Sequence, residues 1–290
     1  MATLSYHEQK DIENIKKLRE LQKELPSFCS DFFRGIETST STRTRIAYAY
    51  DLKIFFQFLK AANPGTFDNP SHTLTPSDLE KLTVTDLEEY IDYLKCHPSD
   101  TNEDVINTER GLMRKISSLR SFYSYFFRNE RIEKNPAALV RMPKLHEKEI
   151  IRLEIDEVAK LLDEVEEGDK LTEKQKLYHE RTKVRDLAMM SLLLGTGIRV
   201  SECVGLNIND IDLDTCGARV YRKGGKESVI YFSDEVRDVL ENYLDEREMI
   251  DAVPGNEDAL FLSMQRKRIN VRSVENLVKK YAKLVTPLKK

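Results

Sequence analysis

The chain has 290 residues and a mass of 33.7 kDa, which is enough for two domains that each bury a core. One third of the residues are charged, 40% are hydrophobic and no long apolar run occurs, so we expect a soluble protein without a membrane-spanning segment. The polar N-terminus predicts no secretory signal. The four cysteines lack metal-ligand spacing, which favours free thiols in a cytoplasmic protein that holds no metal or other cofactor.

The net charge of −4 argues against a general binder of polyanions, but affinity for DNA depends on local phosphate contacts. One stretch is strongly basic: nine Lys or Arg against two Glu lie between Arg110 and Lys144. The sequence therefore permits a basic face on an acidic protein.

The first half of the chain has the periodicity of helices. In chain order, the pattern predicts a helical lead-in over 1–34, a Ser/Thr-rich joint over 38–44, a helix over 45–60, a loop over 61–76, a helix opened by a capping box at 85–88, and a second loop over 97–104.

The clearest helix of this half is predicted over 107–129, with an apolar back and a basic front. Such a helix fits a DNA groove with phosphate contacts at its edges. A merely solvated basic face explains the charge equally well. The candidate DNA contacts are Arg110, Arg114, Lys115 and Arg120 on this helix, Arg43 and Arg45 before it, and Lys226 in the second half.

The helical module is predicted to end near Ala137, and 138–150 is expected to be a linker because it contains a proline and alternating charges. After the linker, the pattern predicts a helix from 153 to 162, a charged insertion of uncertain form at 171–181, and a helix over 184–194.

A tight helical corner is predicted at 192–206, where Gly195 and Gly197 permit a sharp bend. A short helix begins near Arg199, whose guanidinium at such a corner could grip a phosphate with two parallel hydrogen bonds. Spacing alone favours a different interpretation, a structural ion pair between Arg199 and Glu202.

Beyond this corner the period becomes strand-like, and the Gly-Gly turn after Lys223 predicts a β-hairpin. Helices are expected over 233–250 and 271–284, with a short buried segment at 259–263 between them. A lysine at a hairpin tip is usually exposed and inert.

The motif T-G-I-R-V-S-E-C-V-G-L at 196–206, followed by N-D-I-D, closely resembles the first arginine motif of the tyrosine recombinases, the phage-integrase and Xer-type enzymes. R-K-G-G-K-E-S at 222–228 resembles their β-hairpin motif. S-T-R-T-R-I-A-Y at 41–48, with R-K-I-S-S-L-R-S-F-Y at 114–123, is similar to their N-terminal core-binding domain. The resemblance covers roughly residues 35–285.

The resemblance implies a mainly α fold, with a helical, SAM-like core-binding domain over 35–137 and a mixed α+β catalytic domain with a small β-hairpin over 151–290. It implies that Arg199 binds the scissile phosphate, that Glu202 supports the site, and that Lys223 is the catalytic lysine acting as general acid. It also implies double-stranded DNA as partner, with a tetramer of subunits acting through a four-way junction.

In the family, the last predicted helix is followed by H-x-x-R, a second His or Trp, and the tyrosine nucleophile, none of which matches here. All five histidines precede Arg199, and Tyr281 matches the structural helix ahead of H-x-x-R. We therefore expect a catalytic domain truncated at its C-terminal end, without a nucleophile, that binds DNA but does not cleave it.

Two further hypotheses remain open at this stage. One is a non-catalytic DNA-binding protein or regulator derived from a recombinase, which would show salt-dependent binding. The other is a helical interaction module with no role in nucleic-acid binding. The target DNA site and the biological role do not follow from the sequence.

Overall fold

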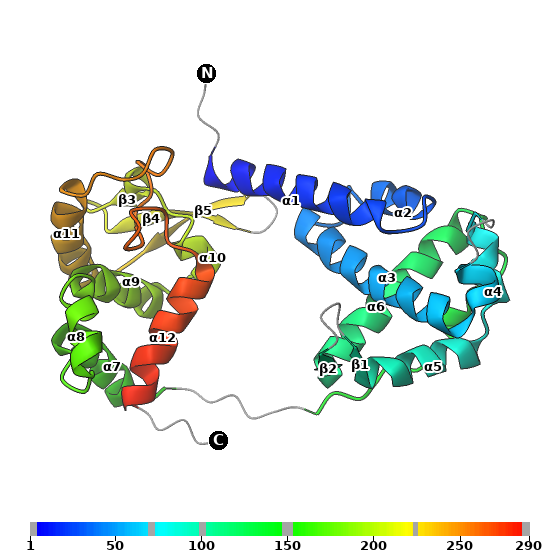
Figure 1. Ribbon diagram of the computed structural model, residues 1–290. Coiled ribbons are helices and arrows are strands. Elements are labelled where there is room, and N and C mark those ends of the chain that lie inside the picture. The colour runs from blue at the N-terminus through cyan, green and yellow to red at the C-terminus, as the bar shows by residue number, and fades with distance from the viewer. Residues whose placement is uncertain (1–4, 69–72, 99–102, 147–152, 223–225, 286–290) are drawn as a thin grey trace. The chain divides into compact units, whose positions relative to one another are not determined.

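The computed structural model describes residues 5–68, 73–98, 103–146, 153–222 and 226–285. The chain divides into two compact units, Met1–Glu149 and Ile150–Lys290 (Figure 1). Within the described ranges, no helix is both long enough and apolar enough to cross a membrane.

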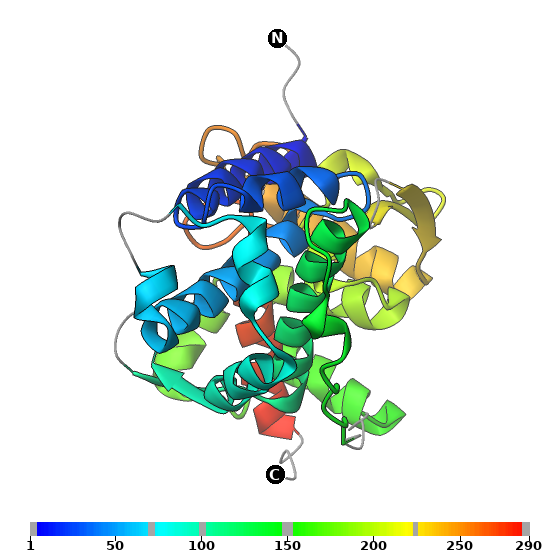
Figure 2. The ribbon, with the colours of Figure 1, turned by 90° about the vertical axis from the view of Figure 1, so that its right-hand side faces the viewer.

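The first unit is almost entirely helical, as its hydrophobic periodicity predicts (Figure 2). Its elements are α1 (Tyr6–Lys23), α2 (Cys29–Gly35), α3 (Thr42–Ala62), α4 (Pro64–Phe67), the 3₁₀ helix η1 (Pro76–Lys81), α5 (Val84–Lys95), β1 (Cys96–Pro98), β2 (Asp104–Ile106), α6 (Glu109–Arg128) and the 3₁₀ helix η2 (Pro136–Ala138).

Aromatic side chains form the core of this unit. Phe122 on α6 lies edge-on to Phe32 of α2, with ring centroids 5.2 Å apart, and to Phe126 at 5.1 Å. All three rings are fully buried. Edge-to-face ring pairs stabilise a fold beyond the burial of their apolar area. The Phe32–Phe122 pair therefore helps to hold α6 against α2.

Three local predictions in this unit were wrong. The capping box that opens α5 is formed by Thr83 and Asp86, two residues earlier than predicted. The predicted loop over 61–76 contains α4 and the start of η1. The described ends of the predicted loop 97–104 belong to β1 and β2, which are antiparallel, with His97 paired with Val105. Hairpins with strands of three residues are too short for alternation to reveal them.

The second unit packs helices against a small sheet. Its elements are α7 (Ile155–Glu167), α8 (Glu173–His179), α9 (Lys183–Thr196), α10 (Val200–Cys203), the 3₁₀ helix η3 (Ile208–Asp210), β3 (Ile211–Asp212), β4 (Gly217–Arg222), β5 (Lys226–Tyr231), α11 (Asp234–Glu248) and α12 (Val271–Val285). The strands are antiparallel in the order β3-β4-β5.

The core of this unit lies between α9, α11 and β4, where the buried faces of Leu192, Leu240 and Val220 meet. The predicted hairpin is confirmed, with Arg222 opposite Lys226 at its end, and the predicted helices after it are confirmed as α11 and α12. The charged insertion at 171–181 contains α8, a helix whose start is capped by Thr172 and Gln175.

Candidate functional site

The predicted corner between α9 and α10 depends on one glycine. Gly197 ends α9 in the left-handed conformation, with φ of +66°, and its N–H bonds the carbonyl of Leu193. A Cβ at Gly197 would meet nothing within 4 Å, so the backbone conformation rather than space requires glycine here. The chain then turns at once into α10, with Arg199 as its N-cap residue.

The carboxylate of Glu202 anchors Arg199 through two hydrogen bonds. It accepts the backbone N–H of Arg199 at 3.0 Å and the Nη1 of the same residue at 2.7 Å. The Glu202 side chain is only 6% exposed, whereas that of Arg199 is 72% exposed. The ion pair and the phosphate-binding interpretation are therefore compatible: one edge of the guanidinium is anchored and most of the group faces outward.

The pKa of Glu202 lies below its usual value. Burial raises this pKa, but the hydrogen bonds and charge of Arg199, with the charge of Arg222, outweigh burial. The carboxylate is thus charged at neutral pH and can fix the guanidinium.

Arg222 is a residue that the sequence analysis missed. It is the exposed last residue of β4, and its charge acts on Glu202 as that of Arg199 does. Its position directly before Lys223 is the sequence feature that could have identified it as part of the site. Lys223 itself lies outside the described residues. Lys226, the first residue of β5, is exposed opposite Arg222.

Two of the candidate DNA contacts in the first unit are buried. Arg45 is 8% exposed, and its Nη1 donates to Glu37 at 2.7 Å. Lys115 is 7% exposed and lies 3.6 Å from the buried carboxylate of Asp51. Both cations serve the packing of the unit, contrary to the expectation that they face DNA.

Arg120 is likewise engaged within its own unit. Its guanidinium donates to the backbone carbonyls of Ala137, at 3.2 Å, and Val140. It thus ties the segment after η2 to α6, which leaves it poorly placed for a phosphate.

The remaining candidates lie on the outside. Arg43 and Arg110 are exposed, and Arg114 keeps 45% of its side chain exposed while it donates to Asp51 at 2.5 Å. The outward face of α6 is formed by side chains spaced three, four or seven positions apart, all exposed except the half-buried Ser121. We name it the α6 stripe: Arg110, Arg114, Ser117, Ser121 and Arg128.

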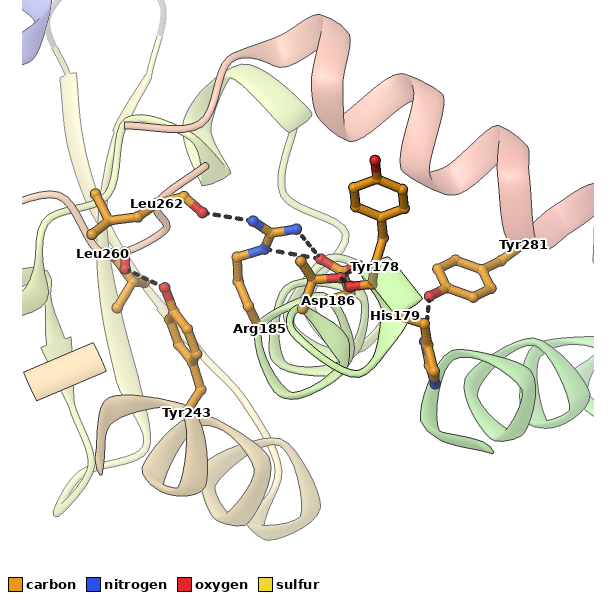
Figure 3. A network of polar contacts seen from close by, with 9 residues as sticks. Tyr178, His179, Arg185, Asp186, Tyr243, Leu260, Leu262 and Tyr281 are labelled. Atoms are coloured by element: carbon orange, nitrogen blue, oxygen red, sulfur yellow. Dashed lines mark hydrogen bonds and ion pairs between the residues drawn. The ribbon is translucent and has the colours of Figure 1, made fainter. Parts of the chain in front are cut away.

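Tyr281 is buried between helices, as Figure 3 shows. Its side chain has no exposed surface, and its hydroxyl lies 3.0 Å from Nδ1 of His179, which is itself 1% exposed. The other ring nitrogen of His179 lies 3.3 Å from the carbonyl of Glu166. Because that carbonyl can only accept, Nε2 carries the proton and Nδ1 accepts the Tyr281 hydroxyl. Tyr281 therefore joins α12 to α7 and α8.

Comparison with known proteins shows which class this fold and arginine corner belong to, and it is a class of DNA breaking-rejoining enzyme. Residues 151–287 match the phage integrase family. The chain is 35% identical to the tyrosine recombinase XerC of Caldanaerobacter subterraneus subsp. tengcongensis, over 89% of this chain and 69% of that protein. It is 31% identical to the tyrosine recombinase XerS of Streptococcus uberis, over 92% of this chain and 82% of that protein.

Solved structures support the fold. A lambda integrase dimer bound to a COC′ core site matches with a TM-score of 0.58 at 15% identity, covering 90% of this chain and 81% of that one. The XerH recombinase bound to a palindromic difH substrate also matches with a TM-score of 0.58, at 14% identity, over 93% of this chain and 72% of that one. This chain belongs to the tyrosine recombinase family.

Proposed function

We propose that the chain binds double-stranded DNA as a site-specific recombinase of the tyrosine type, with Arg199 on the scissile phosphate. The observation that carries this proposal is the half-anchored guanidinium of Arg199. Its mostly exposed side chain is held by a buried carboxylate, so the group is oriented before a ligand arrives. A preoriented charge stabilises the developing negative charge on non-bridging phosphate oxygens without reorganisation during the reaction.

The hairpin supplies the second part of the proposed site. Lys223 lies between Arg222 and Lys226, which face each other across β4 and β5. We assign Lys223 as the general acid toward the leaving 5′-hydroxyl. An ammonium group can give its proton to the leaving oxygen, which is the role of a general acid.

DNA contacts outside the site are assigned to the α6 stripe, with Arg43 on α3. Arginine and serine donate readily to phosphate oxygens, and such contacts set the register of a protein on a duplex. Arg45 and Lys115 are removed from the set because they are buried beside carboxylates of their own unit, and Arg120 because its guanidinium binds backbone carbonyls. Arg114 stays because much of its side chain is exposed although it also bonds Asp51.

The test is the salt dependence of binding to duplex DNA. R110Q with R128Q removes two stripe charges, and we expect the slope of log affinity against log salt to fall by about two units. The matched control is K16Q with R19Q, which removes two exposed charges from α1. An equal effect of both pairs would contradict a DNA face on α6.

We further propose that these 290 residues bind DNA without forming a phosphotyrosyl bond. The structure describes four tyrosines after Arg199. Tyr281 and Tyr243 are buried and hydrogen-bonded, with Tyr243 donating to the carbonyl of Leu260 at 2.9 Å. Tyr221 and Tyr231 lie on the hairpin strands; Tyr231 is 70% exposed, but neither follows the H-x-x-R motif that precedes the nucleophile in the family. A nucleophile needs access to its target and an activating group. The alternative function, a regulator that occupies recombination sites, makes the same prediction for this chain.

Assembly on a four-way junction is proposed from the neighbours. One matching structure is a lambda integrase tetramer bound to a Holliday junction, with a TM-score of 0.57. We expect a junction to retain more copies of the chain than a duplex of equal length, as sedimentation would show. Equal stoichiometry on both would oppose a tetramer.

A further inference from the structure

A cavity of about 220 Å³ lies in the second unit, away from Arg199. It is formed by the start of α9, by α11 and by the loop before α12, and three arginines line it: Arg181, Arg185 and Arg266. Arg185 is in the first turn of α9, whereas Arg199 lies beyond the other end of this helix of 14 residues. The helix is about 21 Å long, so the cavity is a second location.

Arg185 lines this cavity, and its guanidinium is held in place by hydrogen bonds to Asp186 and Leu262, which Figure 3 shows. Its Nε and Nη2 donate to Oδ1 of Asp186 at 2.9 and 2.5 Å, and its Nη1 donates to the carbonyl of Leu262 at 2.8 Å. The other oxygen of Asp186 accepts from Thr182 at 2.9 Å. Both oxygens of Asp186 are thereby engaged, and the Arg185 guanidinium, with five N–H groups, still has two donors to offer.

Arg181 and Arg266 also line the cavity. Both are exposed, and neither forms an ion pair with a described residue. The half-buried hydroxyl of Ser263 also lines the cavity. Arg181 and Arg266 therefore leave positive charge at the cavity, which a bound anion would neutralise.

The backbone at Arg266 supports a ligand-binding role. Its φ is +57°, in the left-handed region that arginine rarely adopts. Two hydrogen bonds of 2.9 Å hold it there, from its N–H to the carbonyl of Ser263 and from the N–H of Val253 to its own carbonyl. Constrained residues of this kind cluster at ligand sites.

We propose that this cavity binds a phosphate group. Guanidinium groups match phosphate oxygens with paired N–H donors, and the only carboxylate lining the cavity within the described chain is that of Glu246. Three arginines and one glutamate line the cavity, a net charge of +2, or +1 when Asp186, which pairs with Arg185, is included. The phosphate comes either from the DNA backbone or from a small phosphorylated molecule, and both sources share this chemistry.

The first experiment measures inorganic phosphate binding to the whole 290-residue protein by isothermal titration calorimetry and ³¹P NMR. Each of R181Q and R266Q should weaken binding about tenfold, the loss expected for one charge-assisted contact. E246Q should tighten binding, because it removes the one opposing charge. R19Q, which removes an exposed charge in the other unit, should leave affinity unchanged.

R266G serves as a second variant, because glycine adopts a positive φ without strain and should preserve the fold. It is expected to weaken phosphate binding as R266Q does. Wild-type phosphate affinity in both R266G and the double variant R181Q with R266Q, together with unchanged DNA affinity, would overturn the proposal.

Duplex titrations distinguish the two sources. If R266Q also lowers DNA affinity and free phosphate competes with the duplex, the ligand is a backbone phosphate. If phosphate binding falls while DNA binding stays unchanged, the ligand is a small phosphorylated molecule. The phosphate measurement does not depend on DNA binding, so failure of the proposed function would leave it interpretable.

Discussion

At the N-cap of α10, a single carboxylate determines how Arg199 is presented. Glu202 has a depressed pKa, so its contribution to stability is complete above the pKa of an unfolded glutamate and is lost as the pH falls through the lower folded value. E202Q should therefore reduce the free energy of unfolding by about 1–2 kcal/mol at pH 7.

The difference between E202Q and wild type should shrink at acid pH, as the pH falls through the lowered pKa of Glu202 and the wild-type side chain is protonated as well. Urea unfolding at pH 7 and at acid pH measures it. The control is E241Q, at an exposed position of α11. A difference that did not depend on pH would contradict a charged Glu202.

Tyr281 provides a second test at the residue scale. In Y281F, Nδ1 of the buried His179 loses its donor, which should cost about 1–3 kcal/mol. Y231F, at a residue that is 70% exposed, should cost nothing measurable by the same urea titration. Full stability in Y281F would mean that the Tyr281–His179 bond contributes little to the docking of α12.

The contrast between Arg199 and Lys115 shows what sequence could reveal at this scale. The Arg199–Glu202 pair was predictable because both partners lie three positions apart on one short helix. The sequence analysis assigned Lys115 to the DNA-binding face. Helical spacing gives the direction of a side chain only approximately, so it did not show that Lys115 points inward. Its partner Asp51 lies 64 positions away on α3, so only the packing of α3 on α6 revealed the burial.

Among the elements, α6 carries two kinds of basic side chain. Arg120 serves the fold by binding carbonyls of the segment after η2, whereas Arg110 faces outward. R120Q should lower the free energy of unfolding of the first unit by about 1–3 kcal/mol, because buried acceptors lose a charged donor.

R110Q is the matched control on the same helix. It should leave stability unchanged within about 0.5 kcal/mol while it lowers DNA affinity. Unfolding monitored by circular dichroism, together with duplex titrations, separates the two effects. Destabilisation by R110Q comparable to that of R120Q would contradict the division of α6 into an internal and an external set.

Long, strongly periodic elements such as α3 and α6 were predictable from the sequence, whereas short ones were not. The hairpin of β1 and β2 has three-residue strands, and α8 is only seven residues long, so neither offers a repeated pattern. The cavity beside α9 could not be predicted, because Arg181, Arg185 and Arg266 are brought together only by the tertiary fold.

At the scale of the whole molecule, the two units have separate hydrophobic cores, which predicts that they unfold independently of each other. Because Met1–Glu149 and Ile150–Lys290 have distinct buried clusters, we expect each to unfold as its own cooperative unit. Hydrogen exchange followed by mass spectrometry should show R120Q raising exchange only in the first unit and Y281F only in the second. Exchange raised across both units by either variant would oppose this independence.

The most direct test of the central claim is one gel experiment with duplex and four-way-junction DNA. The purified 290-residue protein is titrated onto each DNA over a range of salt, and half of every sample is denatured in detergent. We predict salt-dependent retention of both DNAs in the native half and no protein–DNA adduct in the denatured half. A detergent-resistant adduct would contradict the absence of cleavage, and no retention at low salt would contradict DNA binding itself.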